Sequence, residues 1–206
     1  MIRVWRIPYS TNVERVALAL GHKGLSAEWV DVDREDRTAV IEASGQPLVP
    51  VLEDDGTLVS DSTAILEYLE DRYPERPLYP RDEARRAEAV LLIDWFNRVW
   101  KKPPNELERS LTVEERVEKR IRAQVEELER SRDRFEALLA DRPYMLGDEF
   151  GAVDCAFFPF LKYGVIVDPE DTEPFHRILV EHLALDGAYP RLEAWIRRVD
   201  EHPRAQ

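Results

Sequence analysis

Short apolar runs alternate with helical patterns along the first 75 residues. The run at residues 2–7 is rich in β-formers and predicts a strand, and from residue 13 onward apolar side chains recur at helical spacing. Residues 26–33 predict a second strand, and the weakly periodic residues 33–44 predict a short irregular helix. The segments VPVLE and TLVS, joined by Asp-Asp-Gly, predict a β-hairpin that is followed by an amphipathic helix at residues 63–73. The expected order is β-α-β-α-β-β-α.

The rest of the chain has a helical pattern. A proline-rich stretch at residues 74–82 indicates a linker, so we expect domains at residues 1–75 and 83–206 joined by residues 76–82. The pattern predicts one helix over residues 83–102 that KKPPN ends, and a charged helix that begins with a capping box, Thr112 to Glu115, and runs to about residue 140. Residues 152–167 are almost continuously apolar and predict a buried helix, and two amphipathic helices follow it.

Composition narrows the class of protein. The 206 residues carry a formal charge of −13, which argues against nucleic acid or an anionic membrane as the main partner. No stretch has the roughly 20 consecutive apolar residues of a membrane span, and the N-terminus has no apolar signal region. The lone Cys155 excludes an intramolecular disulfide and suits a reducing compartment. We therefore expect a cytoplasmic protein.

The first strand turns into a helix through Ser10, Thr11 and Asn12. Free backbone N–H groups at the positive end of a helix stabilise an anion, whether a phosphate, a carboxylate or a thiolate. These residue types also cap helices in proteins with no site at that place, so the turn alone leaves both interpretations open. The four histidines are scattered without metal-ligand spacing, and no nucleotide-binding fingerprint occurs, so we expect no metal.

Three segments together resemble the cytosolic glutathione transferase family. YSTNVERVALALGHKGL is similar to its catalytic turn and first helix, and PLVPVLEDDGTLVSDSTAILEYLEDRYP is similar to its glutathione-binding hairpin and helix. GAVDCAFFP resembles the motif that opens the core helix of its helical domain. The resemblance implies an α/β thioredoxin-like N-terminal domain with a four-stranded mixed sheet, followed by an all-α C-terminal domain.

The resemblance also assigns roles in thiol activation. Ser10, counted back from Arg15, matches the position that activates the thiol of glutathione, the co-substrate of the family. A hydroxyl hydrogen bond at a helix N-terminus lowers a thiol pKa from about 8.5 toward neutrality. Thr11 is the reserve candidate, because some branches place the hydroxyl one residue later, and Tyr9 is a third.

Two further pairs match the glutathione site of the family. The resemblance implies a cis peptide at Val49-Pro50, whose turn exposes the Val49 backbone to an extended peptide. Asp61 and Ser62 match the pair that holds the γ-glutamyl group, with Asp61 suited to its ammonium and Ser62 to its carboxylate.

The sequence departs from the family pattern at two places. Gly151 stands where the capping motif usually has Ser or Thr, while Asp154 is kept, and we interpret Asp154 as structural. The basic residue that often meets the glycyl carboxylate has no clear equivalent. The candidates left open for this role are His22, Lys23, Arg34, Arg37 and Gln46.

The expected activity is addition of the glutathione thiolate to an electrophilic, largely apolar small molecule, in a detoxification role. We expect Tyr9, Phe96 and Trp100 to line the pocket for this second substrate. Isomerase or dehalogenase variants would use the same thiolate, and a non-catalytic protein that binds a ligand or a partner on the same scaffold is the alternative. The resemblance also implies a homodimer, in which the N-terminal domain of one chain meets the helical domain of the other.

Overall fold

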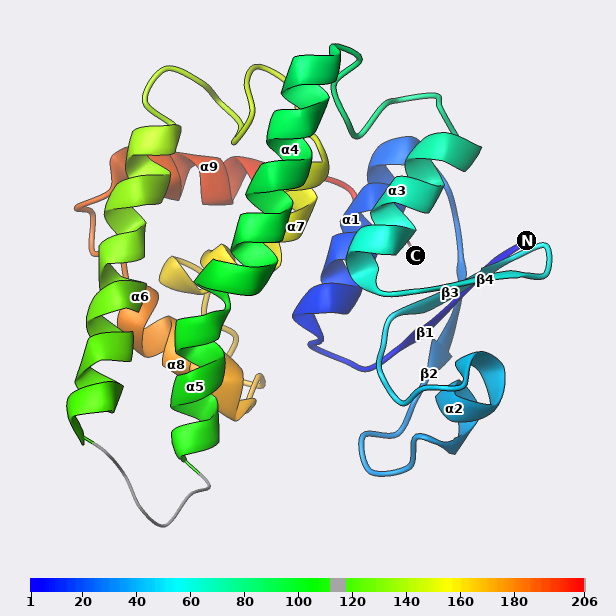
Figure 1. The fold of residues 1–206 in the computed structure, drawn as a ribbon, viewed down its shortest axis with the longest axis horizontal. Helices are drawn as coiled ribbons and strands as arrows, with labels where there is room; N and C mark the ends of the chain where they lie inside the picture. The colour runs from blue at the N-terminus through cyan, green and yellow to red at the C-terminus, as the bar shows by residue number, and fades with distance from the viewer. Residues whose placement is uncertain (112–117, 206) are drawn as a thin grey trace. The chain divides into compact units, whose positions relative to one another are not determined.

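The computed structural model describes residues 1–111 and 118–205, which form two compact units. The first unit comprises Met1–Asp82 together with the residues from Glu201 onward, and the second comprises Glu83–Asp200. Figure 1 shows strands only in the first unit and helices throughout the second. The predicted fold class, an α/β domain followed by an all-α domain, is confirmed.

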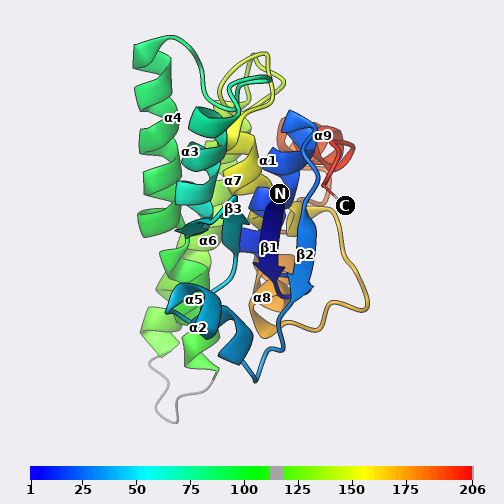
Figure 2. The same ribbon diagram turned by 90° about the vertical axis from the view of Figure 1, so that its right-hand side faces the viewer.

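The first unit contains a four-stranded mixed sheet in the order β2-β1-β3-β4. Strand β1 pairs in parallel with β2 and antiparallel with β3, and β3 pairs antiparallel with β4 (Figure 2). Its elements are β1 (Ile2–Arg6), α1 (Thr11–Lys23), β2 (Glu28–Asp31), α2 (Thr38–Ser44), β3 (Val51–Asp54), β4 (Thr57–Ser60) and α3 (Ser62–Arg72). The predicted order of elements is confirmed.

Successive side chains along each strand point to opposite faces of the sheet, and both faces carry apolar side chains. Trp5 pairs with Val51 on one face, where both join a core cluster with Val40 of α2. Val4 pairs with Leu52 on the other face, and both side chains are buried. Helices α1 and α3 pack against each other beside the sheet (Figure 1). Because both faces are covered, the strands carry apolar residues on both sides.

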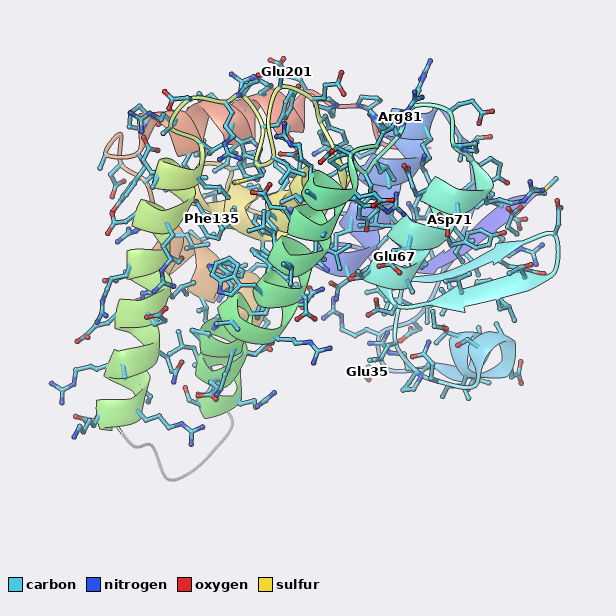
Figure 3. The ribbon with its side chains drawn as sticks, turned by 45° about the horizontal axis from the view of Figure 1, so that its top comes forward. Glu35, Glu67, Asp71, Arg81, Phe135 and Glu201 are labelled. Carbon is cyan, nitrogen blue, oxygen red and sulfur yellow. The ribbon has the colours of Figure 1, made fainter. Side chains whose placement is uncertain are left out.

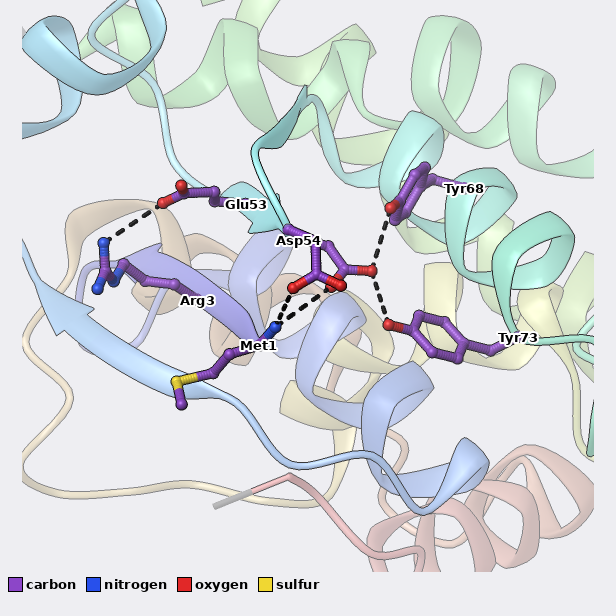
Figure 4. A network of polar contacts seen from close by, with 7 residues as sticks. Met1, Arg3, Glu53, Asp54, Tyr68 and Tyr73 are labelled. Atoms are coloured by element: carbon purple, nitrogen blue, oxygen red, sulfur yellow. Dashed lines mark hydrogen bonds and ion pairs between the residues drawn. The ribbon is translucent and has the colours of Figure 1, made fainter.

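A buried carboxylate fastens α3 to the sheet (Figure 4). Asp54 of β3 is 2% exposed, and its Oδ2 accepts hydrogen bonds from the hydroxyls of Tyr68 at 3.1 Å and Tyr73 at 2.6 Å. The Met1 ammonium lies 3.8 Å from Asp54 Oδ1. Burial and the hydrogen bond to Asp54 raise the pKa of Tyr73 to about 12. This tyrosine therefore stays a hydrogen-bond donor over the whole neutral range.

The first unit also includes the residues of the expected linker and the end of the chain. The expected linker packs onto the first unit, because Leu78 is buried and its N–H donates to Glu70. The chain end also belongs to the first unit, where the N–H of Ala205 donates to the carbonyl of Ala17 on α1. The tail lies so close to α1 that a Cβ on Gly21 would stand 2.1 Å from the carbonyl oxygen of Pro203. A side chain at this position would displace the tail.

The named elements in the described residues of the second unit are all helices. Its elements are α4 (Glu83–Trp95), a π-helical stretch η1 (Phe96–Trp100), α5 (Lys102–Ser110), α6 (Glu118–Leu138), α7 (Ala152–Leu161), a 3-10 turn η2 (Lys162–Gly164), α8 (Pro174–Leu183) and α9 (Pro190–Asp200). The single helix predicted over residues 83–102 was wrong in its last third, where the turns widen to π-helix. Pro103 and Pro104 lie in the first turn of α5, where their missing N–H groups cost nothing. The predicted capping box at Thr112 lies outside the described residues.

Asp154 holds the centre of the second unit together. It is fully buried in the first turn of α7, and its Oδ1 accepts bonds from Met145 N at 3.0 Å and Trp195 Nε1 at 2.7 Å. Oδ2 accepts the N–H of Gly151 at 3.0 Å. Burial raises the pKa of Asp154 to about 6, against the opposing effect of these donors. The structural role that we inferred for Asp154 is confirmed.

Candidate functional site

Strand pairing gathers the candidate residues of the first unit at one end of its sheet. Trp5 pairs with Val51, and Val51 pairs with Ser60. The end of β1, the start of β3 and the end of β4 therefore lie side by side. Ser10 follows the first of these strands, Val49 precedes the second and Asp61 follows the third. Residues separated by some 50 positions in the sequence thus share one edge of the unit.

Ser10 is the N-cap of α1. Its backbone is extended, with φ −63° and ψ 115°, and its Oγ accepts a hydrogen bond from the N–H of Val13 at 3.4 Å. The side chain is half-buried. Because the hydroxyl oxygen accepts the capping bond, the hydroxyl hydrogen is left to point toward an anion. Capping and thiol activation are therefore compatible at this residue.

The two neighbours of Ser10 are less suited to thiol activation. Thr11 is 7% exposed in the first turn of α1, so its hydroxyl has little surface to offer a ligand. Tyr9 is 43% exposed and adopts a left-handed backbone with φ 62°. An aromatic side chain in that conformation is uncommon, and it places an apolar ring at the surface directly beside Ser10.

The peptide bond between Val49 and Pro50 is cis, as the resemblance implied. Pro50 is buried while Val49 is half-buried, immediately before β3 begins. Within the described residues, neither the N–H nor the C=O of Val49 is hydrogen-bonded to another backbone group. An extended peptide can therefore pair with this segment as an additional strand.

Asp61 and Ser62 begin α3. Asp61 has a left-handed backbone with φ 78°, and its Oδ1 accepts the N–H groups of Thr63 at 2.8 Å and Ala64 at 3.2 Å. Its side chain is exposed, whereas Ser62 is only 4% exposed. The strained conformation of Asp61 keeps a carboxylate at the surface and the helix N-terminus beside it.

The structure adds Arg15 to this group. Arg15 is 1% exposed, and its Nη1 donates to Ser62 Oγ at 3.3 Å, which links α1 to the start of α3. In the sequence, Arg15 served only as the position from which Ser10 was located. The available signal was its position on the same helical face as Leu18 and Ala19, both fully buried, because an arginine among buried residues needs polar partners. The site therefore contains one buried cation.

Two of the candidates for a carboxylate-binding base lie away from this end of the sheet. Lys23 and His22 end α1, about 20 Å along the helix from Ser10. Lys23 is buried against Glu70, with an Nζ–Oε2 distance of 3.0 Å. His22 Nε2 lies 3.3 Å from the carbonyl oxygen of Pro77, and burial lowers its pKa.

Phe96 and Trp100 belong to the core of the helical unit. Phe96 is fully buried and stacks on Trp100 with ring centroids 4.3 Å apart, and on Phe157 at 4.2 Å. Trp100 is 3% exposed and meets Phe135 edge to face. Figure 3 shows the Phe135 ring between the helices of this unit. Aromatic packing within the helical unit therefore accounts for the burial of both side chains.

The described residues hold no group of three or more His, Cys, Asp or Glu side chains placed to bind a metal ion. Cys155 lies fully buried in α7. Among the helices of residues 1–111 and 118–205, none is both long enough and apolar enough to cross a membrane.

Two family models match this chain. The family model for the glutathione S-transferase N-terminal domain matches residues 5–77, and the model for the C-terminal domain matches residues 118–198. Glutathione S-transferase GstB of Escherichia coli is 32% identical over 170 residues, which cover 78% of this chain and 82% of GstB. A stringent starvation protein A homolog of Coxiella burnetii is 24% identical over 94% of this chain and 93% of its own length.

Among solved structures, the theta class glutathione S-transferase of Xanthomonas axonopodis pv. citri with glutathione bound has a TM-score of 0.70 at 26% identity. The match covers 98% of this chain and 93% of that one. The chain therefore belongs to the cytosolic glutathione S-transferase family. It is a glutathione transferase enzyme.

Proposed function

We propose that this protein is a serine-type glutathione transferase in which Ser10 activates the glutathione thiol for attack on an electrophilic, largely apolar small molecule. One observation carries the assignment. The Ser10 hydroxyl oxygen accepts the Val13 N–H at 3.4 Å, so its hydrogen is directed away from the helix, at the same end of the sheet as Val49 and Asp61.

Activation in this proposal is electrostatic. A sulfur placed at Ser10 accepts the hydroxyl hydrogen bond and lies at the positive end of the thirteen-residue helix α1. Both effects favour the thiolate over the thiol, so the thiol proton passes to solvent without a strong protein base. The sulfur electron pair then forms a bond to the electrophilic carbon. The displaced electrons leave with a leaving group, or enter an adjacent double bond that takes up a proton from solvent. Tyr9, exposed beside Ser10, is the residue we propose for contact with that second substrate.

The remaining residues orient the peptide. The Val49 backbone pairs with the cysteinyl unit, and the exposed carboxylate of Asp61 receives the γ-glutamyl ammonium. The γ-glutamyl carboxylate lies at the N-terminus of α3, where Ser62 receives the Arg15 bond of 3.3 Å. Arg15 is then a positioning residue, since it fixes the Ser62 hydroxyl and adds positive charge behind it.

A homodimer in the cytoplasm and a role in detoxification complete the proposal. Apolar side chains are exposed on both units: Leu58 of β4 is 48% exposed, and Leu91 of α4 is 69% exposed. Burial of these side chains against a second copy would remove apolar surface from water. Sedimentation of the intact protein at micromolar concentration tests this part, and a monomer would contradict it.

A second candidate is a non-catalytic protein that binds a thiol ligand or a partner on the same scaffold. The observation in its favour is the match, over nearly all of this chain, to a relative described as a stringent starvation protein A homolog. The same activated thiolate would also serve an isomerase or dehalogenase reaction. Turnover of electrophiles separates the enzymatic candidates from the binding candidate.

The test of glutathione binding is titration calorimetry with reduced glutathione. We expect binding by the unaltered protein and a loss of at least about tenfold in Ser62→Ala, because a hydrogen bond to a charged group contributes about 1.5–3 kcal/mol. The matched control is Ser26→Ala, since Ser26 is an exposed serine that precedes β2 at the opposite end of the sheet. Absence of binding by the unaltered protein at millimolar glutathione would contradict the proposal.

The test of Ser10 is the pH profile of kcat/KM for Ser10→Ala and Ser10→Thr. We expect the alanine variant to shift the thiol pKa upward by about 1–2 units and to lose about 10–100-fold in kcat/KM at neutral pH. Ser10→Thr keeps a hydroxyl and should retain most of the activity. An unchanged profile for Ser10→Ala would exclude Ser10 as the activating residue.

A further inference from the structure

The tail of the chain, residues 201–205, lies along one face of α1. That face carries residues three or four positions apart in the sequence: Ser10, Glu14, Ala17 and Gly21. Pro203 lies against Gly21, and the N–H of Ala205 donates to the carbonyl of Ala17 at 3.0 Å. From Pro203 onward the tail therefore runs toward the N-terminus of α1.

An ion pair joins the tail to the first turn of α1. Arg204 Nη2 lies 3.2 Å from Glu14 Oε1, and Arg204 Nη1 donates to the carbonyl of His202 at 3.0 Å. These two bonds hold the guanidinium against the helix, where the side chains of Arg204 and Glu14 are only 27% and 19% exposed. A partly buried pair is screened less by salt than an exposed one, so its charges act on their surroundings.

Glu14 lies one helical turn from Ser10. The N–H of Glu14 donates to the carbonyl of Ser10 at 3.0 Å, and four residues rise about 6 Å along an α-helix. Side chains on a helix lean toward its N-terminus, so the Glu14 side chain leans toward the turn that Ser10 begins. The neighbouring Arg15 is buried on another face, where it donates to Ser62 Oγ. A carboxylate at residue 14 without a cation would oppose the formation of a thiolate beside Ser10.

Two histidines also lie where the tail meets α1. Burial lowers the pKa of His22, in the last turn of the helix, and the charges of Lys23 and Arg76 add to this effect. Burial lowers the pKa of His202 as well, with further contributions from His22 and Arg204. Both histidines are therefore uncharged at neutral pH, whereas Arg204 is a permanent cation.

We infer, on the basis of the proposed function, that Arg204 is a positioning residue for thiol activation, which offsets the charge of Glu14 and thereby favours the thiolate beside Ser10. The pair joins residues 190 positions apart in the sequence. Arg204 gives up no proton and forms no bond to the ligand, so the thiol proton still passes to solvent. A tail that left α1 would take its cation with it, and docking of the tail therefore regulates the acidity of the bound thiol.

The test is an ultraviolet titration of the thiolate of reduced glutathione bound to the intact protein. We expect Arg204→Met to raise the thiol pKa by about 0.5 unit and Glu14→Gln to lower it by about the same amount, as for one charge acting over roughly 8–10 Å near a protein surface. The double variant Glu14→Gln/Arg204→Met should return to within about 0.2 unit of the unaltered protein. A loss of packing alone would not shift the thiol pKa in opposite directions in the two single variants.

Two further variants separate the charge of the tail from its packing. Gly21→Ala keeps both charges but displaces the tail, so it should raise the thiol pKa in the same direction as Arg204→Met. The matched control is Arg3→Met, which breaks an exposed pair with Glu28 at 3.2 Å near the start of β1, away from the strand end that leads to Ser10. This control should leave the thiol pKa unchanged.

The outcomes distinguish this inference from the proposed function. Identical thiolate titrations for Arg204→Met, Glu14→Gln and the unaltered protein would overturn the inference, and the proposed function would stand if Ser10→Ala still shifted the titration. Shifts of the same sign in the two single variants would also overturn it, because they would indicate a role in folding alone. If reduced glutathione does not bind, the proposed function and the inference fail together.

Discussion

Replacing Lys23 by methionine should destabilise the first unit more than any surface charge substitution. The Lys23 side chain is completely buried, and its Nζ donates to Glu70 Oε2 at 3.0 Å, to the carbonyl of Tyr73 at 2.7 Å and to that of Arg76 at 3.3 Å. Glu70 Oε2 also accepts the N–H of Leu78 at 2.8 Å. The pair therefore ties the end of α1 to α3 and to the chain that follows α3.

The expected loss in the free energy of unfolding follows from the buried carboxylate that the substitution leaves without its cation. Methionine keeps the length and apolar stem of Lys23, so little packing is lost. The Glu70 carboxylate, 9% exposed, would remain buried without its cation, and breaking a buried pair in this way costs about 3–5 kcal/mol. The double variant Lys23→Met/Glu70→Met removes both charges and should cost clearly less than the sum of the two single variants.

Urea unfolding followed by tryptophan fluorescence measures this cost, provided that the slope m is unchanged. The matched control is Arg130→Met, which breaks the exposed pair with Glu126 on α6, whose side chains are 62% and 61% exposed. That variant should lose no more than about 1 kcal/mol. A loss for Lys23→Met as small as for the control, or additive single variants, would refute the reasoning.

Three other substitutions test the packing described above. Asp154→Asn should cost at least about 3 kcal/mol in urea unfolding, because an amide NH2 would face N–H donors that now bind a carboxylate. Tyr73→Phe should remove the latest phase of the phenolate absorbance titration, since burial and Asp54 raise the pKa of Tyr73 to about 12, and an unchanged titration would contradict that assignment. Gly21→Ala should lower the melting temperature, because its Cβ would overlap Pro203 O; an unchanged melting curve would show that the tail does not dock there.

Local chemistry specified much of the candidate site in advance. Asp55 and Gly56 have φ values of 47° and 86°, as the hairpin pattern predicted, and Gly24 ends α1 with φ 70°. Ser10 and Asp61 both accept backbone N–H groups of the helix they begin. Each of these features depends on the few residues around it, so the sequence pattern suffices to predict it.

Side-chain partners far apart in the chain could not be predicted in the same way. Periodicity predicts that one face of α1 is buried, but not that Arg15 on that face meets Ser62, 47 residues away. The apolar spacing of Phe96 and Trp100 fits a pocket wall and a packed core equally well. The structure places Phe96 in stacking contact with Phe157, a contact that the spacing could not predict.

The sequence by itself determined the elements of the first unit and their order, the change to an all-helical second unit and the family, because capping, turn chemistry and hydrophobic periodicity are local properties. It did not predict the π-helical stretch η1 or helix α5. The tertiary structure decided that residues after 200 join the first unit, that Lys23 is buried in an ion pair and that Arg15 is the cation at the candidate site. Strand register and helix packing set these contacts, and both depend on the whole folded unit.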